Sequence, residues 1–265
     1  MSASLERVRS ILFLPASNPR AIGHARESAA DLVILDLEDA VKPEDKDSAR
    51  SAAVEAVASG WPMPVAIRLN EIGTEWHSLD VDAVARSDAQ FAVLPRATSG
   101  HLAHEVAEAV RKPLLAMIET PSAVLAAAEI ASNAAALIAG TNDLRADLRV
   151  PMGSDRGAIS ASLQLIVLAA RASGIPAFDG VFNDLEDVEG FAAECAEGRS
   201  LGFDGKSLIH PKQIETCIRT FSPSEEELAR ARRLVEAFGG GAERFEGQMI
   251  ERMHVEAAKR LLERS

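Results

Sequence analysis

The chain has 265 residues and a formal net charge of -12, which argues against general nucleic-acid binding but allows a local basic pocket for an anionic substrate. Only 4% of the residues are aromatic and tyrosine is absent, so an aliphatic core is expected, as buried parallel strands require. No signal peptide or run of 18 apolar residues is found, and Cys195 and Cys217 lack metal-ligand spacing. We therefore expect a cytoplasmic protein without a membrane partner.

Short apolar segments alternate with helix-like segments along the chain. The predicted strands cover residues 10–14, 32–36, 64–70, 91–94, 114–118, 136–140, 177–181 and 205–209. Helices are expected at about 17–28, 45–59, from 74, from 98, at 121–131 and at 158–172. This order predicts a (β/α)8 barrel, although a doubly wound open sheet would use similar elements. The barrel is favoured because polar residues recur directly after the strands, and a barrel gathers those positions on one rim.

A helical tail follows the last predicted strand. Ser222, Pro223 and Ser224 form a helix start, and the helices are expected at 225–238 and 251–263, with three glycines between them. We predict a catalytic barrel domain over residues 1–221 and a C-terminal helical extension over 222–265. The extension would pack on the barrel or on a neighbouring subunit.

Two acidic residues end neighbouring predicted strands. Glu119 follows the fifth strand and Asp143 follows the sixth, so parallel neighbours would bring both carboxylates to the same rim. Paired carboxylates suit magnesium, which prefers oxygen ligands and keeps water or substrate in its other positions. The alternative is that both are ordinary loop carboxylates. Thr141 and Asn142 could donate hydrogen bonds to a substrate beside Asp143, or they could simply cap the turn.

A second acidic cluster ends the second predicted strand, where Asp36, Glu38 and Asp39 fall within four positions. Crowded like charges cost free energy unless a cation offsets them. Arg68, at the end of the third strand, can supply that cation and could also bind a substrate carboxylate through two N–H groups. A buried structural ion pair is the competing interpretation of Arg68, and both roles can hold together.

A set of sequence strings in order along the chain resembles the citrate lyase beta-subunit-like family of the HpcH/HpaI aldolase superfamily. The strings are RSILFLPASNP from Arg9, LVILDLEDAV from Leu32, IRLNEIGTEWHSLD from Ile67, AMIETP from Ala116, GTNDLRADL from Gly140, DGVFNDLEDVEGF from Asp179, GFDGKSLIHPKQI from Gly202 and SPSEEELARARRLVEAF from Ser222. Any one of these strings is weak evidence, but eight in register are strong.

The resemblance implies a (β/α)8 barrel with a magnesium site, a homotrimer, and carbon-carbon lyase chemistry on hydroxyacyl thioesters of coenzyme A or an acyl carrier. By motif, Glu119 and Asp143 would hold the metal, and Arg68 would bind the substrate carboxylate. In cleavage, a base takes the hydroxyl proton and charge moves onto the thioester enolate. Glu38 or Asp39 is the candidate base within the chain.

Two departures from the family pattern affect the expected substrate. Relatives often have ETxRG and LPK, where this chain has Ser122 in place of the arginine and Arg96 in place of the lysine. The short tail also weakens the case for a malyl-coenzyme A lyase with a full lid. Thioester hydrolysis, keto-acid aldol chemistry and non-catalytic thioester binding are the alternatives to a lyase.

Overall fold

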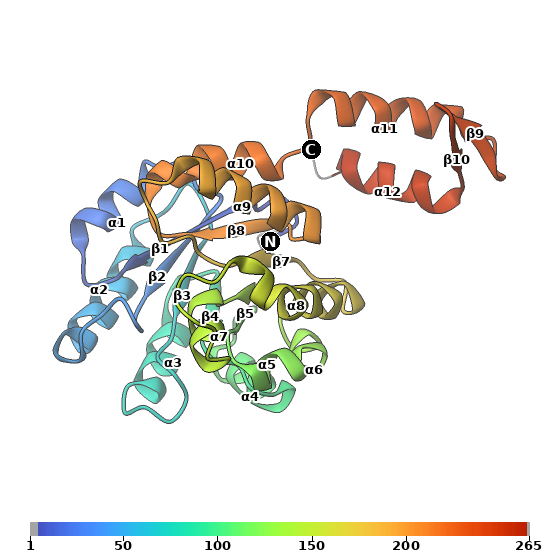
Figure 1. Ribbon diagram of the computed structural model, residues 1–265. Helices are drawn as coiled ribbons and strands as arrows, with labels where there is room; N and C mark the ends of the chain where they lie inside the picture. Colours follow the sequence, from blue (N-terminus) through green and yellow to red (C-terminus); the bar gives the residue numbers. More distant parts are fainter. Residues whose placement is uncertain (1–4, 264–265) are drawn as a thin grey trace.

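The computed structural model describes residues 5–263, in which eight parallel strands form a closed barrel in sequence order (Figure 1). β1 pairs with both β2 and β8, which closes the sheet and confirms the predicted (β/α)8 fold. The strands are β1 (Ser10–Pro15), β2 (Leu32–Asp36), β3 (Val65–Arg68), β4 (Phe91–Leu94), β5 (Leu114–Ile118), β6 (Ala136–Ala139), β7 (Ala177–Asp179) and β8 (Gly205–Leu208).

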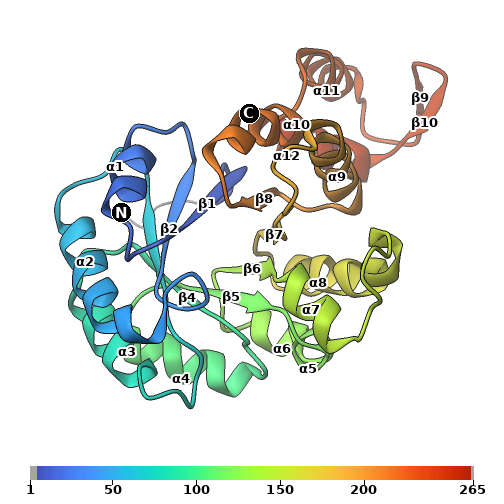
Figure 2. The ribbon, with the colours of Figure 1, turned by 60° about the vertical axis from the view of Figure 1, so that its left-hand side comes forward.

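Helices surround this barrel and cover its outer face (Figure 2). The α-helices of the barrel are α1 (Pro19–Arg26), α2 (Lys46–Ala58), α3 (His77–Arg86), α4 (Gly100–Val110), α5 (Pro121–Leu125), α6 (Ala127–Ala131), α7 (Thr141–Asp147), α8 (Ser160–Ala172), α9 (Val188–Leu201) and α10 (Ile214–Phe221). Three single-turn helices are η1 (Pro43–Asp45), η2 (Arg156–Ile159) and η3 (Pro211–Gln213). None of the helices within residues 5–263 is long and apolar enough to cross a membrane.

The alternation of side chains along each strand decides which residues enter the barrel interior. In β2, Leu32 and Ile34 belong to the interior cluster, whereas Val33 and Leu35 pack against the helices. Because alternate residues of a strand share a face, Asp36 continues the interior set. The same parity carries Arg68 at the end of β3 and Glu119 just after β5 into the interior. The strand period thus aims three charged side chains at one space.

Several elements differ from the sequence-based expectation. The predicted helix 121–131 is divided at Ala126, which has φ -96° and ψ 6°, and each half buries its own apolar residues. The predicted strands 64–70 and 177–181 end earlier, at Arg68 and Asp179, because their last residues leave the ladder for the rim. Residues expected as a loop after β6 instead start α7, which puts Asp143 in its first turn, where the helix dipole favours an acidic residue.

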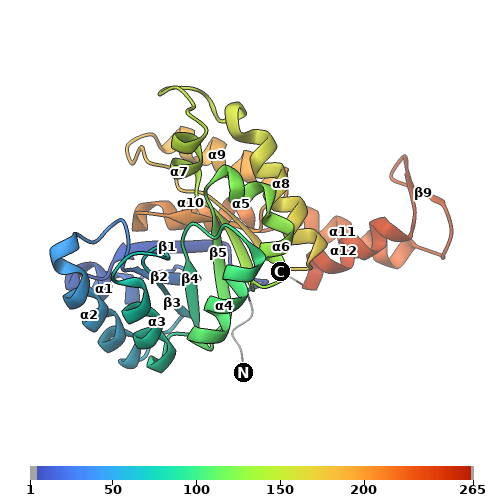
Figure 3. The ribbon, with the colours of Figure 1, turned by 90° about the horizontal axis from the view of Figure 1, so that it is seen from below.

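The C-terminal segment forms an arm that projects from the barrel (Figure 3). Its helices α11 (Glu225–Ala237) and α12 (Arg252–Glu263) pack on each other around a small apolar cluster of their own. A hairpin of β9 (Glu243–Phe245) and β10 (Gln248–Ile250), which the sequence analysis missed, joins the two helices. The hairpin turns at Glu246 and Gly247, both with positive φ. Whether the arm docks on a neighbouring subunit stays a prediction.

Candidate active site

A cavity of about 350 Å3 opens at the C-terminal ends of the barrel strands, the end at which active sites of this fold lie. It gathers side chains from the ends of several strands that are distant in sequence. Every predicted site residue except Glu38 lines it, namely Asp36, Asp39, Arg68, Glu119, Thr141, Asn142 and Asp143.

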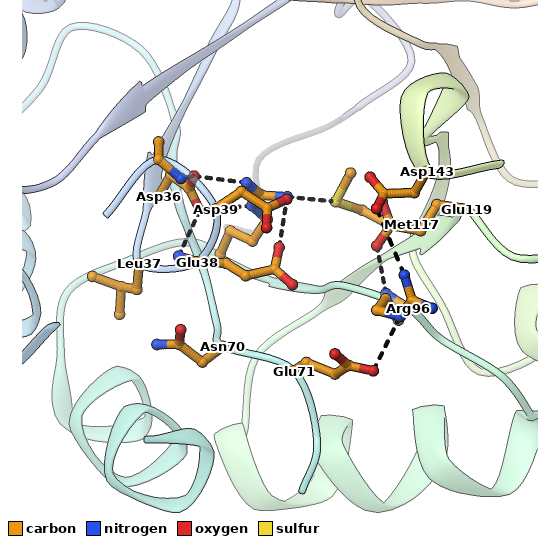
Figure 4. Close-up of polar contacts among 12 residues, drawn as sticks. Asp36, Leu37, Glu38, Asp39, Asn70, Glu71, Arg96, Met117, Glu119 and Asp143 are labelled. Carbon is orange, nitrogen blue, oxygen red and sulfur yellow. Dashed lines mark hydrogen bonds and ion pairs between the residues drawn. The ribbon is translucent and has the colours of Figure 1, made fainter. Parts of the chain in front are cut away.

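Arg68 contacts three acids at the end of β2, namely Asp36, Glu38 and Asp39, and these acids lie together on one side of the site (Figure 4). Its Nε and Nη2 each donate to one carboxylate oxygen of Asp36 at 2.6 Å, which is a two-point ion pair. Its Nη1 lies 2.7 Å from Oε2 of Glu38 and 3.5 Å from Oδ2 of Asp39. The two-point edge of the guanidinium is therefore engaged by Asp36 within the protein, as the structural ion-pair interpretation of Arg68 expected.

Burial and the charge of Arg68 shift the pKa values of Asp36 and Glu38 in opposite directions. Burial by itself would raise the pKa of Asp36, but the charge and hydrogen bonds of Arg68 outweigh it and lower that pKa. Burial raises the pKa of Glu38 to about 8, since Arg68 offsets only part of the desolvation and Asp39 adds repulsion. The pKa of Asp36 is therefore held low while that of Glu38 is raised, so Glu38 takes up a proton more readily than Asp36 does.

Glu119 lies on the opposite side of the cavity from Asp36 and is 2% exposed (Figure 4). Its Oε1 accepts a 2.6 Å hydrogen bond from the backbone N–H of Arg96, which has φ 45° and is thus in the left-handed region. Nη1 of Arg96 lies 3.6 Å from Oδ1 of Asp143. A Cβ placed on Gly140 would lie 2.3 Å from both Oε2 and Cβ of Glu119, so only glycine leaves room for this carboxylate.

The carboxylate pair fits a magnesium ion. Burial raises the pKa of Glu119 to about 7, with Arg96 and Arg68 opposing the rise and Asp143 adding to it. Burial and the charge of Asp39 also raise the pKa of Asp143. A bound cation would relieve this excess of negative charge with hard oxygen donors. Within residues 5–263 no three His, Cys, Asp or Glu side chains are grouped as a metal cage, and magnesium often uses only one or two protein carboxylates.

The rim beside the carboxylate pair carries two amide side chains. Asn142 and Asn183 exchange hydrogen bonds of 2.7 and 3.3 Å, which link the start of α7 to the loop after β7. Thr141 is 7% exposed and packs beside Gly180, where a Cβ would come within 2.5 Å of its side chain. Both Thr141 and Asn142 thus reach the cavity, as the sequence analysis predicted, although their binding roles stay predictions.

Several cavity residues were not predicted as site residues. Phe13, Met117 and Ser207 lie at interior strand positions and line the cavity, as does Asn183. Every second residue of a barrel strand points into the interior, and this alternation could have predicted Phe13, Met117 and Ser207 as site residues. The role of the Arg96 backbone gave no such signal, because nothing in a sequence marks an arginine for positive φ.

An acidic pair and an arginine facing one cavity at the mouth of a (β/α)8 barrel agree with the sequence motifs. The chain belongs to the HpcH/HpaI aldolase/citrate lyase family, whose model matches residues 9–211. Both the curated relatives and the solved structures make it a CitE-like member of that family.

Two curated relatives cover nearly the whole chain. The chain is 40% identical over 266 residues to a (3S)-malyl-CoA thioesterase of Cereibacter sphaeroides, covering 96% of this chain and 93% of the relative. It is 32% identical to the citrate lyase subunit beta of Escherichia coli K12, and the match covers 100% of this chain and 97% of that relative. The family relationship therefore extends to both coenzyme A-related lyases and thioesterases.

The solved structures agree with these relatives. CitE from Mycobacterium tuberculosis, in complex with magnesium, acetoacetate and coenzyme A, superimposes with a TM-score of 0.85 and 34% identity, covering 98% of this chain and 99% of that one. A citrate lyase beta subunit from the same organism, complexed with oxaloacetate and magnesium, has a TM-score of 0.74 and 32% identity. The match covers 83% of this chain and 99% of that structure's chain. Structural neighbours of this chain therefore bind magnesium.

Proposed function

We propose that the protein is a magnesium-dependent enzyme acting on a short hydroxyacyl-CoA of the malyl-, citramalyl- or citryl-CoA type. The observation that carries the proposal is that Glu119 and Asp143 share one cavity with Arg68. A hydroxy acid presents a hydroxyl beside a carboxylate, which suits a metal on one side and an arginine on the other. Relatives named for malyl-CoA and citrate lyase, and a neighbour with bound coenzyme A, support this substrate class.

In this proposal each charged residue has a separate task. Glu119 and Asp143 would hold magnesium, which supplies Lewis-acid stabilisation of negative charge on the substrate oxygens. Arg68 would fix the substrate carboxylate from its Nη1 side, while Asp36 keeps the guanidinium oriented through its two 2.6 Å contacts. Thr141 and Asn142 would hydrogen-bond the substrate beside Asp143.

Carbon-carbon cleavage is the leading reaction. A base takes the hydroxyl proton, the bond between the hydroxyl-bearing carbon and the thioester α-carbon breaks, and the hydroxyl oxygen becomes the carbonyl of a keto acid. The bonding electrons pass to the thioester enolate, whose α-carbon then takes a proton to give the shorter acyl-CoA. Asp39 is favoured over Glu38 as the base because it lines the cavity, whereas Glu38 lies against Arg68 with its pKa raised to about 8.

Thioester hydrolysis is the second candidate. The 40% identity to (3S)-malyl-CoA thioesterases over almost the full length favours it, since the citrate lyase beta subunits are 32% identical. The two reactions share the metal, the arginine and the substrate, and they differ in which bond breaks.

The deciding experiment is incubation with malyl-, citramalyl-, citryl- and methylmalyl-CoA, with magnesium or with EDTA, followed by mass spectrometry. A keto acid with a shorter acyl-CoA identifies the lyase, whereas free coenzyme A with an intact hydroxy acid identifies the thioesterase. Asp143→Asn should abolish either reaction, and Glu108→Gln, at an exposed helix position, should not. Turnover that persists in EDTA would contradict the metal assignment.

We also propose a homotrimer, in which the arm over residues 222–265 contacts a neighbouring barrel. The arm has a small apolar core of its own, and Met249 and Met253 are exposed on it by 65% and 61%. Light scattering of the full chain tests the oligomer, and a monomer at micromolar concentration would contradict it.

A further inference from the structure

Lys46 lies at the start of α2, is 6% exposed, and uses all three of its ammonium N–H groups. It donates to the backbone carbonyl oxygens of Leu37 and Glu38, each at 2.7 Å, and to Oδ1 of Asn70 at 2.6 Å. The first two acceptors belong to the loop that follows β2. Lys46, at the end of the loop, thus binds the backbone at the beginning of the same loop.

The third acceptor is itself held in place. The backbone N–H and the side-chain amide of Asn70 both donate to Oδ2 of Asp80, at 2.9 and 2.6 Å. Asp80 is fully buried, and its Oδ1 accepts from Nε of Arg50 at 2.7 Å. This chain of contacts anchors Lys46 to α2 and α3, two rigid elements of the barrel wall.

The loop held by Lys46 carries the acids beside Arg68. On its cavity side the backbone N–H groups of Glu38 and Ala40 donate to the two oxygens of Asp36, at 2.9 and 3.0 Å. On its other side the carbonyl groups of Leu37 and Glu38 accept from Lys46. The peptide groups of the loop are therefore fixed from both sides, which sets the direction in which the carboxylates of Glu38 and Asp39 leave the backbone.

We propose that Lys46 is a positioning residue for Glu38 and Asp39, an inference that rests on the proposed function of those acids. A packing role would suit an apolar side chain, but here three oxygens need donors in a buried place. Asp36, Glu38 and Asp39 also gather against Arg68, and the ammonium group of Lys46 adds a second positive charge that interacts with these acids. Lys46 does not line the cavity, so it acts through the loop rather than on substrate.

The test compares Lys46→Met with Lys42→Met, a matched control at an exposed lysine of the same loop. In Lys46→Met we expect kcat to fall about 10–100-fold, as when an outer-shell partner is lost. The magnesium Kd from calorimetry should stay within about twofold, because Glu119 and Asp143 belong to other elements. Amide exchange over residues 37–41 should become more than about tenfold faster. Lys42→Met should change none of these.

An unchanged kcat, or exchange over residues 37–41 as slow as in the parent protein, would overturn the inference. So would a loss of magnesium affinity parallel to the loss of kcat, since it would mean general damage to the barrel mouth. If the parent protein turns over no substrate, the proposed function fails and the exchange result alone decides the role of Lys46. If Lys46→Met does not fold, Lys46→Gln, which keeps two donors, is measured in the same way and should show the same pattern at smaller size.

Discussion

Replacing Glu119 by glutamine should stabilise the metal-free protein at alkaline pH. Burial raises the pKa of Glu119 from 4.5 to about 7, so its ionisation is harder in the folded than in the unfolded state. A raised folded-state pKa favours folding below the unfolded value, and this advantage is lost as the pH rises through the folded value. At about 1.4 kcal/mol per pKa unit, the carboxylate costs the folded state about 3 kcal/mol at pH 8.5 and less than about 1 kcal/mol at pH 5.

Glutamine has nearly the same shape, can accept the Arg96 N–H and does not titrate. The assay is urea denaturation of both proteins in EDTA at pH 5 and pH 8.5. The stability of Glu119→Gln relative to the parent should rise between these pH values by about 2–3 kcal/mol. Added magnesium should stabilise only the parent protein. Equal stability differences at the two pH values would refute the reasoning, and Glu108→Gln provides the exposed control.

Three further predictions concern the same site. Gly140→Ala should weaken magnesium binding more than about tenfold and lower the free energy of unfolding by about 1–3 kcal/mol, because the added Cβ of residue 140 would lie 2.3 Å from Glu119. Magnesium affinity that stays unchanged in calorimetry would contradict this contact. Arg68→Lys should lower kcat/KM about 10–100-fold, since lysine cannot keep both bonds to Asp36 and still reach the substrate; steady-state kinetics that match the parent would remove Arg68 from the site. Magnesium affinity should fall about tenfold for each pH unit below 7, where a proton must leave Glu119, and should level off above 7; a flat profile from pH 5 to 8 would speak against Glu119 as a ligand.

Much of the fold follows from local sequence. Most of the eight strands were predicted as short apolar runs, the composition that a strand buried on both faces needs. β8 departs from this composition, because Lys206 and Ser207 lie within it. Asp36, Arg68 and Glu119 were predicted at the rim for the same local reason, since each follows an apolar run directly. The arm helices were also predicted from local signals, among them the Ser224 cap, which forms a capping box with Glu227.

The hairpin of the arm and the division of the helix at Ala126 were missed. The hairpin strands have three residues each, which is too few to show a hydrophobic period. Their turn has a positive φ at Glu246, and glutamate is not a residue type that predicts a positive φ. The break at Ala126 lies in an alanine-rich stretch with good helix propensity, so only packing of the two halves reveals it.

The contacts between the site residues are the feature that only the tertiary structure decided. Sequence alone left Arg68 between a substrate role and a structural ion pair, and the structure pairs it with Asp36, 32 positions away. Likewise, the Arg96 backbone reaches Glu119 across 23 positions, and Asn142 meets Asn183 across 41. Strand periodicity acts between neighbouring residues, so the sequence by itself determined that side chains at the strand ends, such as Arg68 and Glu119, enter the barrel mouth. Which of them touch, and which carry a proton, depends on distances and desolvation that exist only after the barrel closes.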